Sequence, residues 1–332
     1  MKKTILASLV AVLLGGGAFF AHAQFDATGA SNLELLPFPA NPEPFSQVRI
    51  ELHNFATDLN KASITWTQDG KVVARGTGVT DYVFKTGKRG AVTTINVTVV
   101  TISDGTLRGT LSINPSDVDL VWEADTTVPL LYKGKALPSS ESTVKVVAFP
   151  HLVRSGKEIP ADKLTYTWKI DGKVQQKLSG FGKNILIYQK NLLRGDNAVS
   201  VEVSSLDNTT GSEKEIVVPE REPEIHFYEN NALEGIIYDV ALDGGFTLVD
   251  PEASLRAEPY YFSTADMNTA NSSIEWSVNG EKVPASKVSP LDLVLRAPKD
   301  TEGESRISLT LTNNKKIIQS KEASTVVTFK KQ

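Results

Sequence analysis

One short sequence pattern occurs three times in this chain of 332 residues, and it constrains the fold more than any other feature. Each copy has a tryptophan inside a strand-like stretch, then Asp-Gly or Asn-Gly, then a second strand-like stretch. The tryptophans are Trp66, Trp168 and Trp276, which lie 102 and 108 residues apart. A fixed period of this size indicates repeated structural units, each about 100 residues long.

The dipeptides that follow the tryptophans predict tight hairpin turns. Two-residue hairpin turns need positive φ angles, which Gly, Asn and Asp adopt at low cost. The predicted turn residues are Asp69 and Gly70, Asp171 and Gly172, and Asn279 and Gly280.

Alternating apolar runs flank each copy of the pattern. One run precedes the tryptophan and another follows it, for example 48–52 and 95–99 in the first copy. A period of two with apolar residues on one side indicates half-buried strands. Beyond the first 23 residues no stretch has helical periodicity. About seven short strands per repeat predict an all-β sandwich.

The repeated Trp-x-x-(Asp/Asn)-Gly pattern, between a β-branched strand and an alternating strand, resembles bacterial immunoglobulin-like domains. It also resembles the related PKD-like domains of secreted surface proteins. The resemblance implies three tandem Ig-like β-sandwich domains, at 24–116, 117–222 and 223–332. The chain departs from the antibody pattern because it has no cysteine, and it lacks the W-x-F-G-D-G motif of PKD domains and the calcium signatures of cadherins.

Residues 1–23 have the features of a secretory signal peptide. Two lysines precede an uncharged, mostly apolar run that ends in Ala21-His22-Ala23, so we expect cleavage after Ala23. The alternative is an uncleaved anchor, but the run from Ile5 to Phe20 is shorter than the roughly 20 residues that a spanning helix needs. We therefore expect a secreted or cell-surface protein without stable membrane insertion.

Composition excludes several function classes. A net charge of −4 does not suit a nucleic-acid binder, and the absence of cysteine excludes disulfides, iron–sulfur clusters and thiol nucleophiles. The chain contains no H-E-x-x-H, G-x-S-x-G or Walker pattern. We therefore predict no catalytic residue, no cofactor and no metal ligand, and no enzyme activity. The acidic excess of the last repeat leaves a Ca²⁺ site open, although its spacing matches no known loop.

Aromatic residues raise two further questions. The repeated tryptophans are expected in the cores, although a tryptophan can also serve as a sugar-stacking platform. Tyr260 and Tyr261 are neighbours in one strand-like run, so they cannot both face the core of a regular strand. One of them marks a candidate contact patch, and packing against a neighbouring loop is the alternative.

These observations predict a secreted, non-catalytic array with a structural or adhesive role at a bacterial cell surface. A bacterial source is expected because extracellular animal domains commonly depend on disulfides. Cell-envelope or surface proteins are the expected partners, and a glycan is possible. The alternative is a carbohydrate- or peptide-binding accessory module that works beside an enzyme on another chain; an unrecognised hydrolase is a third hypothesis.

Overall fold

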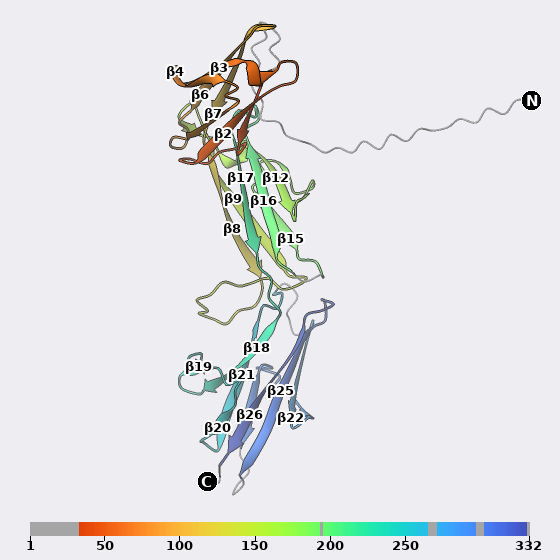
Figure 1. Ribbon diagram of the computed structural model, residues 1–332. Coiled ribbons are helices and arrows are strands. Elements are labelled where there is room, and N and C mark those ends of the chain that lie inside the picture. Colours follow the sequence, from red (N-terminus) through yellow and green to blue (C-terminus); the bar gives the residue numbers. More distant parts are fainter. Residues whose placement is uncertain (1–32, 193–194, 265–270, 297–301, 331–332) are drawn as a thin grey trace, which may run out of the picture. The chain divides into compact units, whose positions relative to one another are not determined.

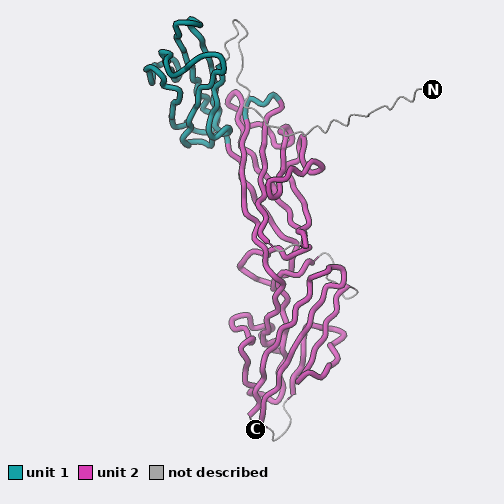
Figure 2. The backbone as a smooth tube through the Cα atoms, turned by 45° about the vertical axis from the view of Figure 1, so that its right-hand side comes forward, with its two compact units in different colours: residues 1–116, 207–210 teal, residues 117–206, 211–332 magenta. Residues whose placement is uncertain are grey.

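The computed structural model describes residues 33–192, 195–264, 271–296 and 302–330 (Figure 1). The chain forms two compact units, residues 1–116 with 207–210 and residues 117–206 with 211–332 (Figure 2). Regular structure in the described ranges is β-strand, apart from two short 3-10 helices, η1 (Leu59–Lys61) and η2 (Ala161–Lys163). The predicted all-β class is therefore confirmed. The predicted signal peptide lies outside the described residues.

The strands of the first unit form one β-sandwich, here called sandwich 1. Its small sheet has the order β1-β2-β5 and its large sheet the order β4-β3-β6-β7. The strands are β1 (Leu33–Phe38), β2 (Gln47–Asn54), β3 (Ser63–Gln68), β4 (Lys71–Thr77), β5 (Asp81–Lys85), β6 (Thr93–Thr101) and β7 (Gly105–Ile113). Buried aliphatic residues from both sheets form one core around Trp66.

The second unit begins with sandwich 2, whose small sheet has the order β15-β9-β8. Its large sheet has the order β13-β12-β16-β17, with β14 also paired to β12, and a separate short pair joins β10 to β11. The strands are β8 (Asp117–Asp125), β9 (Thr143–His151), β10 (Val153–Arg154), β11 (Lys157–Glu158), β12 (Thr165–Ile170), β13 (Lys173–Val174), β14 (Gly180–Phe181), β15 (Ile185–Gln189), β16 (Asn197–Ser204) and β17 (Gly211–Val218).

The second unit continues with sandwich 3, whose core is separate from that of sandwich 2. Its small sheet has the order β19-β18-β21-β24 and its large sheet the order β20-β26-β25-β22-β23, in which β20 runs parallel to β26. The strands are β18 (Glu224–Asn231), β19 (Gly235–Ile237), β20 (Phe246–Leu248), β21 (Glu252–Tyr260), β22 (Ser272–Val278), β23 (Glu281–Val283), β24 (Asp292–Arg296), β25 (Gly303–Asn313) and β26 (Ser320–Phe329).

The repeated tryptophans are fully buried, and each makes the same hydrogen bond. The indole N–H of Trp66 donates to the backbone carbonyl of Val79 at 2.8 Å. The corresponding bonds run from Trp168 to Lys183 and from Trp276 to Pro290, both at 2.9 Å. Each acceptor lies two residues before β5, β15 or β24. A tryptophan of the large sheet therefore fixes the start of a small-sheet strand and ties the two sheets together.

The hairpin turns after the tryptophans also share one arrangement. Both residues of each turn have positive φ, for example 49° at Asp171 and 74° at Gly172. The Asp171 backbone N–H donates to the Ala198 carbonyl at 2.8 Å, and its Oδ1 accepts the Ala198 N–H at 2.9 Å. Asp69 makes the same pair of bonds to Thr94, and Asn279 makes it to Arg306. Asp or Asn suits this turn position for two reasons. It tolerates a positive φ angle, and its side chain accepts a hydrogen bond from the strand that neighbours the hairpin in the large sheet, which is β6, β16 or β25.

Replacing Trp168 by Ala is expected to lower the free energy of unfolding by about 3–5 kcal/mol, because it leaves a large cavity between the sheets. Trp168→Phe keeps most of the apolar volume but removes the donor, so a smaller loss of about 1–3 kcal/mol is expected. Urea unfolding followed by circular dichroism measures both. A Trp168→Phe protein as stable as the wild type would contradict the role given to the indole hydrogen bond.

Replacing Asp171 by Ala is expected to destabilise sandwich 2 by about 1–3 kcal/mol, because the side-chain acceptor is lost and positive φ becomes strained. Asp171→Asn is the matched control, since Asn279 performs the same task in sandwich 3. It should stay within about 0.5 kcal/mol of the wild type. Chemical denaturation measures the free energy of unfolding of both variants. An equal loss of stability in both would contradict the stabilising role given to the lateral hydrogen bond.

Candidate functional site

The outward faces of the three small sheets are the candidate interaction surfaces of this chain. Successive residues of a strand point to opposite sides of a sheet, so each small sheet has one face on the core and one directed outward. The outward face is apolar in sandwich 2, charged in sandwich 1 and partly covered by loops in sandwich 3. The three sandwiches share the buried tryptophan and its hydrogen bond, but they differ in the side chains on these outward faces.

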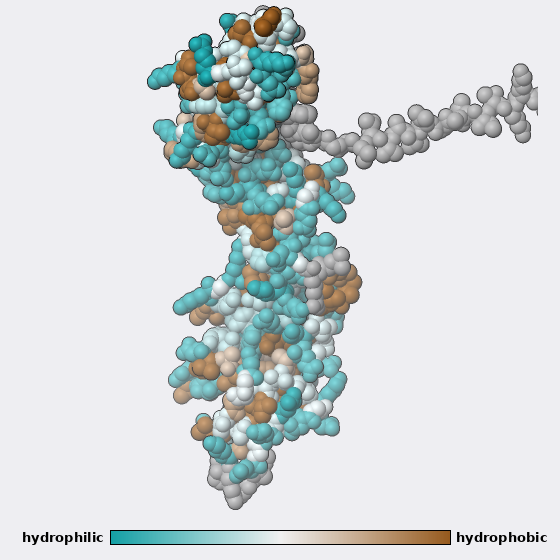
Figure 3. All heavy atoms as spheres, viewed as in Figure 1, coloured by the Kyte–Doolittle hydropathy of each residue, from teal (hydrophilic) through white to brown (hydrophobic). Residues whose placement is uncertain are grey.

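The outward face of β15-β9-β8 carries a contiguous set of apolar side chains, here called the apolar face. The strand register places Val121, Val147 and Ile185 in one row across the three strands. Phe149 and Ile187 lie on the same face, two residues along β9 and β15. The exposed fractions are 57% for Val121, 49% for Phe149, 44% for Ile185 and 52% for Ile187. Figure 3 shows apolar residues at the surface at the level of β8 and β9.

Charged residues at the margin of the apolar face are paired among themselves. Nζ of Lys145 lies 3.1 Å from Oε1 of Glu123 on the neighbouring strand. His151 lies between two carboxylates, 3.5 Å from Asp119 and 2.9 Å from Glu158. Contiguous exposed apolar surface of this kind is typical of a contact site, with a polar rim around an apolar centre.

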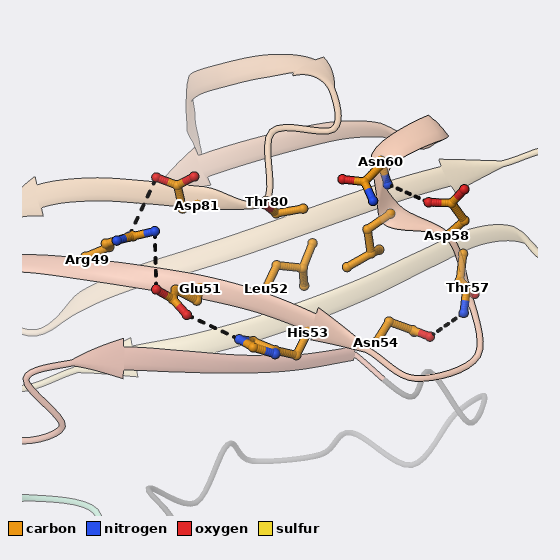
Figure 4. A pocket seen from close by; sticks show the side chains of 11 residues that line it. Arg49, Glu51, Leu52, His53, Asn54, Thr57, Asp58, Asn60, Thr80 and Asp81 are labelled. Carbon is orange, nitrogen blue, oxygen red and sulfur yellow. Dashed lines mark hydrogen bonds and ion pairs between the residues drawn. The ribbon is translucent and has the colours of Figure 1, made fainter.

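The small sheet of sandwich 1 carries charged side chains on its outward face. The register pairs Arg49 with Val83 and Glu51 with Asp81. Nη2 of Arg49 lies 3.3 Å from Oε1 of Glu51, and its Nε lies 3.8 Å from Oδ2 of Asp81. Nε2 of His53 lies 3.3 Å from Oε2 of Glu51. These side chains form one wall of an open pocket of about 430 Å³ (Figure 4).

The opposite wall of the pocket is the loop that follows β2. Oδ1 of Asn54 accepts the backbone N–H groups of Ala56 and Thr57, both at 2.8 Å, which fixes the loop as a turn. The Asp58 carboxylate caps η1 and lies 3.3 Å from Nζ of Lys61. The hydrogen bond from Lys61 and the one from the loop backbone lower the pKa of Asp58. The pocket is therefore lined by a prearranged set of donors and acceptors.

Tyr260 and Tyr261 do not form an exposed contact patch, because both rings are buried. Tyr132, from the loop between β8 and β9, packs edge-on against Tyr260 with ring centroids 5.6 Å apart. Its hydroxyl lies 3.4 Å from that of Tyr261. The chain turns directly after β21, with φ of 64° at Tyr261, and this lets both rings meet the same loop. Burial raises the pKa of Tyr261 to about 12. Tyr260 and Tyr261 therefore pack against a neighbouring loop, which was the alternative to a contact patch.

Sandwiches 2 and 3 share a hydrogen-bonded joint within the second unit. The Tyr261 N–H donates to the Thr127 carbonyl, and the Thr127 N–H donates to the Phe262 carbonyl, both at 2.7 Å. Buried Gln319 donates from Nε2 to the Ser140 carbonyl at 2.8 Å. The buried polar groups named here are paired, as groups removed from water need to be. No single residue of the joint has a distinctive motif, which is why sequence reasoning missed it.

A second polar contact of the joint involves a carboxylate. Oε2 of Glu141 accepts the backbone N–H groups of Ile317 and Ile318, at 2.7 Å and 3.1 Å. These amides belong to the hairpin between β25 and β26. This contact links the hairpin to the residues just before β9, and it is a second connection between sandwiches 2 and 3.

His226 lies on the outward face of β18 between two carboxylates. Its Nδ1 lies 2.6 Å from Asp243 and its Nε2 lies 3.1 Å from Glu224. Burial disfavours the imidazolium, but the hydrogen bonds to Asp243 and Glu224 outweigh it and raise the pKa of His226 above its ordinary value. The protonated form therefore stabilises this part of sandwich 3.

The described residues contain no group of three or more His, Cys, Asp and Glu side chains that could hold a metal ion. The described part of the acidic last repeat therefore gives no support to the Ca²⁺ site considered from the sequence. In the same ranges, no helix has the length and apolar character needed to span a membrane.

No family model matches the chain, and no curated protein matches it. Similar solved structures include the fibronectin(III)-like modules of Clostridium thermocellum CbhA, at 12% identity, with 57% of this chain and 94% of that chain covered and a TM-score of 0.28. The central fibronectin-III array of RIM-binding protein is similar at 10% identity, over 92% of this chain and 100% of that chain, with a TM-score of 0.30.

A glycan-binding protein is also among the similar structures. SGBP-B of the Bacteroides ovatus mixed-linkage glucan utilization locus, in complex with a mixed-linkage heptasaccharide, is 14% identical over 91% of this chain and 67% of that chain, with a TM-score of 0.21. These likenesses concern the fold alone. The paired antiparallel sheets and separate cores make this chain a tandem array of immunoglobulin-like β-sandwiches, as the sequence resemblance implied.

The raised pKa of His226 predicts a pH-dependent stability. The contribution of this residue is fully present below its unfolded pKa of about 6.5 and is lost as pH rises through the higher folded pKa. The free energy of unfolding should therefore fall over the pH range above about 6.5, and His226→Gln should lack this part of the fall. Urea denaturation across this range measures both proteins, and parallel pH profiles would contradict the assignment.

Proposed function

We propose that this chain is a secreted, non-catalytic array of immunoglobulin-like domains that binds a protein of the cell envelope or cell surface. Contact is made through the apolar face of sandwich 2. The observation that carries this proposal is the in-register row of Val121, Val147 and Ile185 on the outward face of a regular sheet, in which Val121 and Ile185 are exposed and Val147 is half-buried. Isolated exposed aliphatic residues are common, whereas a row across three adjacent strands is not.

Sandwich 3 supports this interpretation by contrast. Two loops cover part of its outward face, where Tyr132 and Tyr238 pack against the rings of Tyr260 and Tyr228. The corresponding face of sandwich 2 keeps its apolar side chains exposed. Each Å² of apolar surface removed from water stabilises a complex by about 25 cal/mol before the costs of association. A partner protein would gain this energy by covering the apolar face.

The histidines of the described chain support a non-catalytic role. His53, His151 and His226 each pair with a carboxylate rather than with a serine or threonine hydroxyl. Glu51 and Asp81, two carboxylates that line the pocket of sandwich 1, are partly exposed beside Arg49. A general acid at neutral pH is usually held in an apolar site, which this pocket is not.

Domain organisation and location are part of the proposal. We place three domains at 24–116, 117–222 and 223–332, supported by the separate cores of the three sandwiches. Secretion rests on the sequence of residues 1–23, and a bacterial source on the absence of cysteine. The alternative, a carbohydrate- or peptide-binding accessory module, is favoured by a different observation, the polar pocket of sandwich 1.

The double substitution Val121→Lys with Ile185→Lys is expected to weaken binding to washed cell envelopes at least about tenfold, which corresponds to about 1.4 kcal/mol. Two lysines at the centre of the contact would have to lose their hydration there. Binding is measured as saturable retention of purified 24–332 on envelopes with and without their surface proteins.

The matched control is Val217→Lys with Val174→Lys, which places the same charges at exposed positions of the large sheet. It should bind like the wild type. All four positions are exposed, so unfolding midpoints should change little. Equal binding by both double variants to envelopes that keep their surface proteins would overturn the proposed contact.

A further inference from the structure

We infer that the pocket of sandwich 1 binds a neutral, polyhydroxylated ligand, which is the chemistry of a glycan chain. The inference rests on the proposed function in one respect, namely that the array binds rather than catalyses. It concerns a second surface, on another sandwich, with a ligand of another class. The apolar face and the pocket can therefore be tested independently.

The pocket joins a sheet face to a loop, and both are fixed by the fold. Arg49, Glu51 and Asp81 come from adjacent strands whose register holds them side by side. Asn60 and Asp58 come from the loop and η1, on the other side of Thr80 (Figure 4). The volume of about 430 Å³ lies in the range of known small-ligand sites, roughly 300–1,000 Å³. Because both walls are set by backbone pairing and capping, the site is formed without a ligand.

Charge selects against ionic ligands. Three carboxylates, those of Glu51, Asp58 and Asp81, line the pocket and would repel an anion. Arg49 reaches toward two of these carboxylates and Lys61 toward the third, so a cationic ligand would meet groups that are already paired with cations. A neutral ligand avoids both penalties.

The remaining polar groups select for hydroxyls among neutral ligands. The walls offer acceptors on Glu51 and Asp81 and both donors and acceptors on Asn60 and Thr80. A hydroxyl group both donates and accepts, and two neighbouring hydroxyls can donate to the two oxygens of one carboxylate. An apolar ligand would instead remove these groups from water without replacing their hydrogen bonds.

Two exposed aromatic residues adjoin residues of the polar walls, one in the strand register and one along the chain. Phe38 is 51% exposed and stands in the same row as Arg49, on the outward face of β1. Phe55 is 90% exposed and directly follows Asn54 of the pocket wall. A sugar ring has apolar C–H faces, and an aromatic ring can cover such a face while hydroxyls at the ring edge reach polar groups. Polar walls with adjoining aromatic residues therefore fit a chain of sugar rings better than a single polar metabolite.

The test uses purified 24–332 and isothermal titration calorimetry with neutral hexasaccharides of glucose (cellohexaose and maltohexaose), mannose and N-acetylglucosamine. Hexagalacturonate and hexalysine are the anionic and cationic probes. We expect saturable binding of at least one neutral probe, and weaker or no binding of both charged probes. Asp81→Asn with Phe55→Ser should weaken the neutral probe at least about tenfold, which is about 1.4 kcal/mol.

The apolar-face variant, Val121→Lys with Ile185→Lys, is the matched control and should bind the neutral probe like the wild type. Absence of binding by all neutral probes would overturn the inference, and so would equal binding by the pocket variant. Tighter binding of either charged probe would also overturn it. None of these outcomes affects envelope retention through the apolar face, so failure of this inference and failure of the proposed function are distinguishable.

Discussion

The hydrogen bond from a buried tryptophan to the start of a small-sheet strand is the interaction on which the rest of the structure depends. It occurs at Trp66, Trp168 and Trp276, each time to a carbonyl two residues before the strand. An indole buried between two sheets must place its N–H on an acceptor, and here the acceptor belongs to the connection between the sheets. One side chain thus fills the core and sets where the small sheet begins. With the core fixed in this way, the outward faces are free to differ among the repeats.

The outward faces of the three small sheets differ in the side chains that they carry. In sandwich 2 the face is apolar and exposed, and in sandwich 1 it is charged and borders a pocket. In sandwich 3 it is partly covered by tyrosines from two loops, next to a joint in which Gln319 and Glu141 pair with backbone groups of the neighbouring sandwich. Within the second unit, one sandwich therefore leaves apolar side chains of its outward face exposed, and the other uses part of this face for internal contacts.

Sequence reasoning predicted the fold class, the strand-turn-strand units and the residues of the hairpin turns, because these follow from local rules of alternation and φ angle. It did not predict the lateral bond from Asp171 to Ala198, since a turn residue and its partner 27 positions away have no local signature. Tyr260 and Tyr261 were candidates for a contact patch, but Tyr132, 129 residues before Tyr261, reaches across to them. The apolar face was equally hidden: an alternating strand does not show which of its outward residues lie in one row with those of its neighbours.

The most direct test of the central claim is photo-crosslinking from the apolar face in the source cells, with a photoreactive phenylalanine analogue in place of Ile185. We expect a covalent adduct with one protein species from this position, and none from the same analogue at Val217 on the opposite sheet. No adduct from position 185, or the same adducts from both positions, would contradict a protein contact through the apolar face.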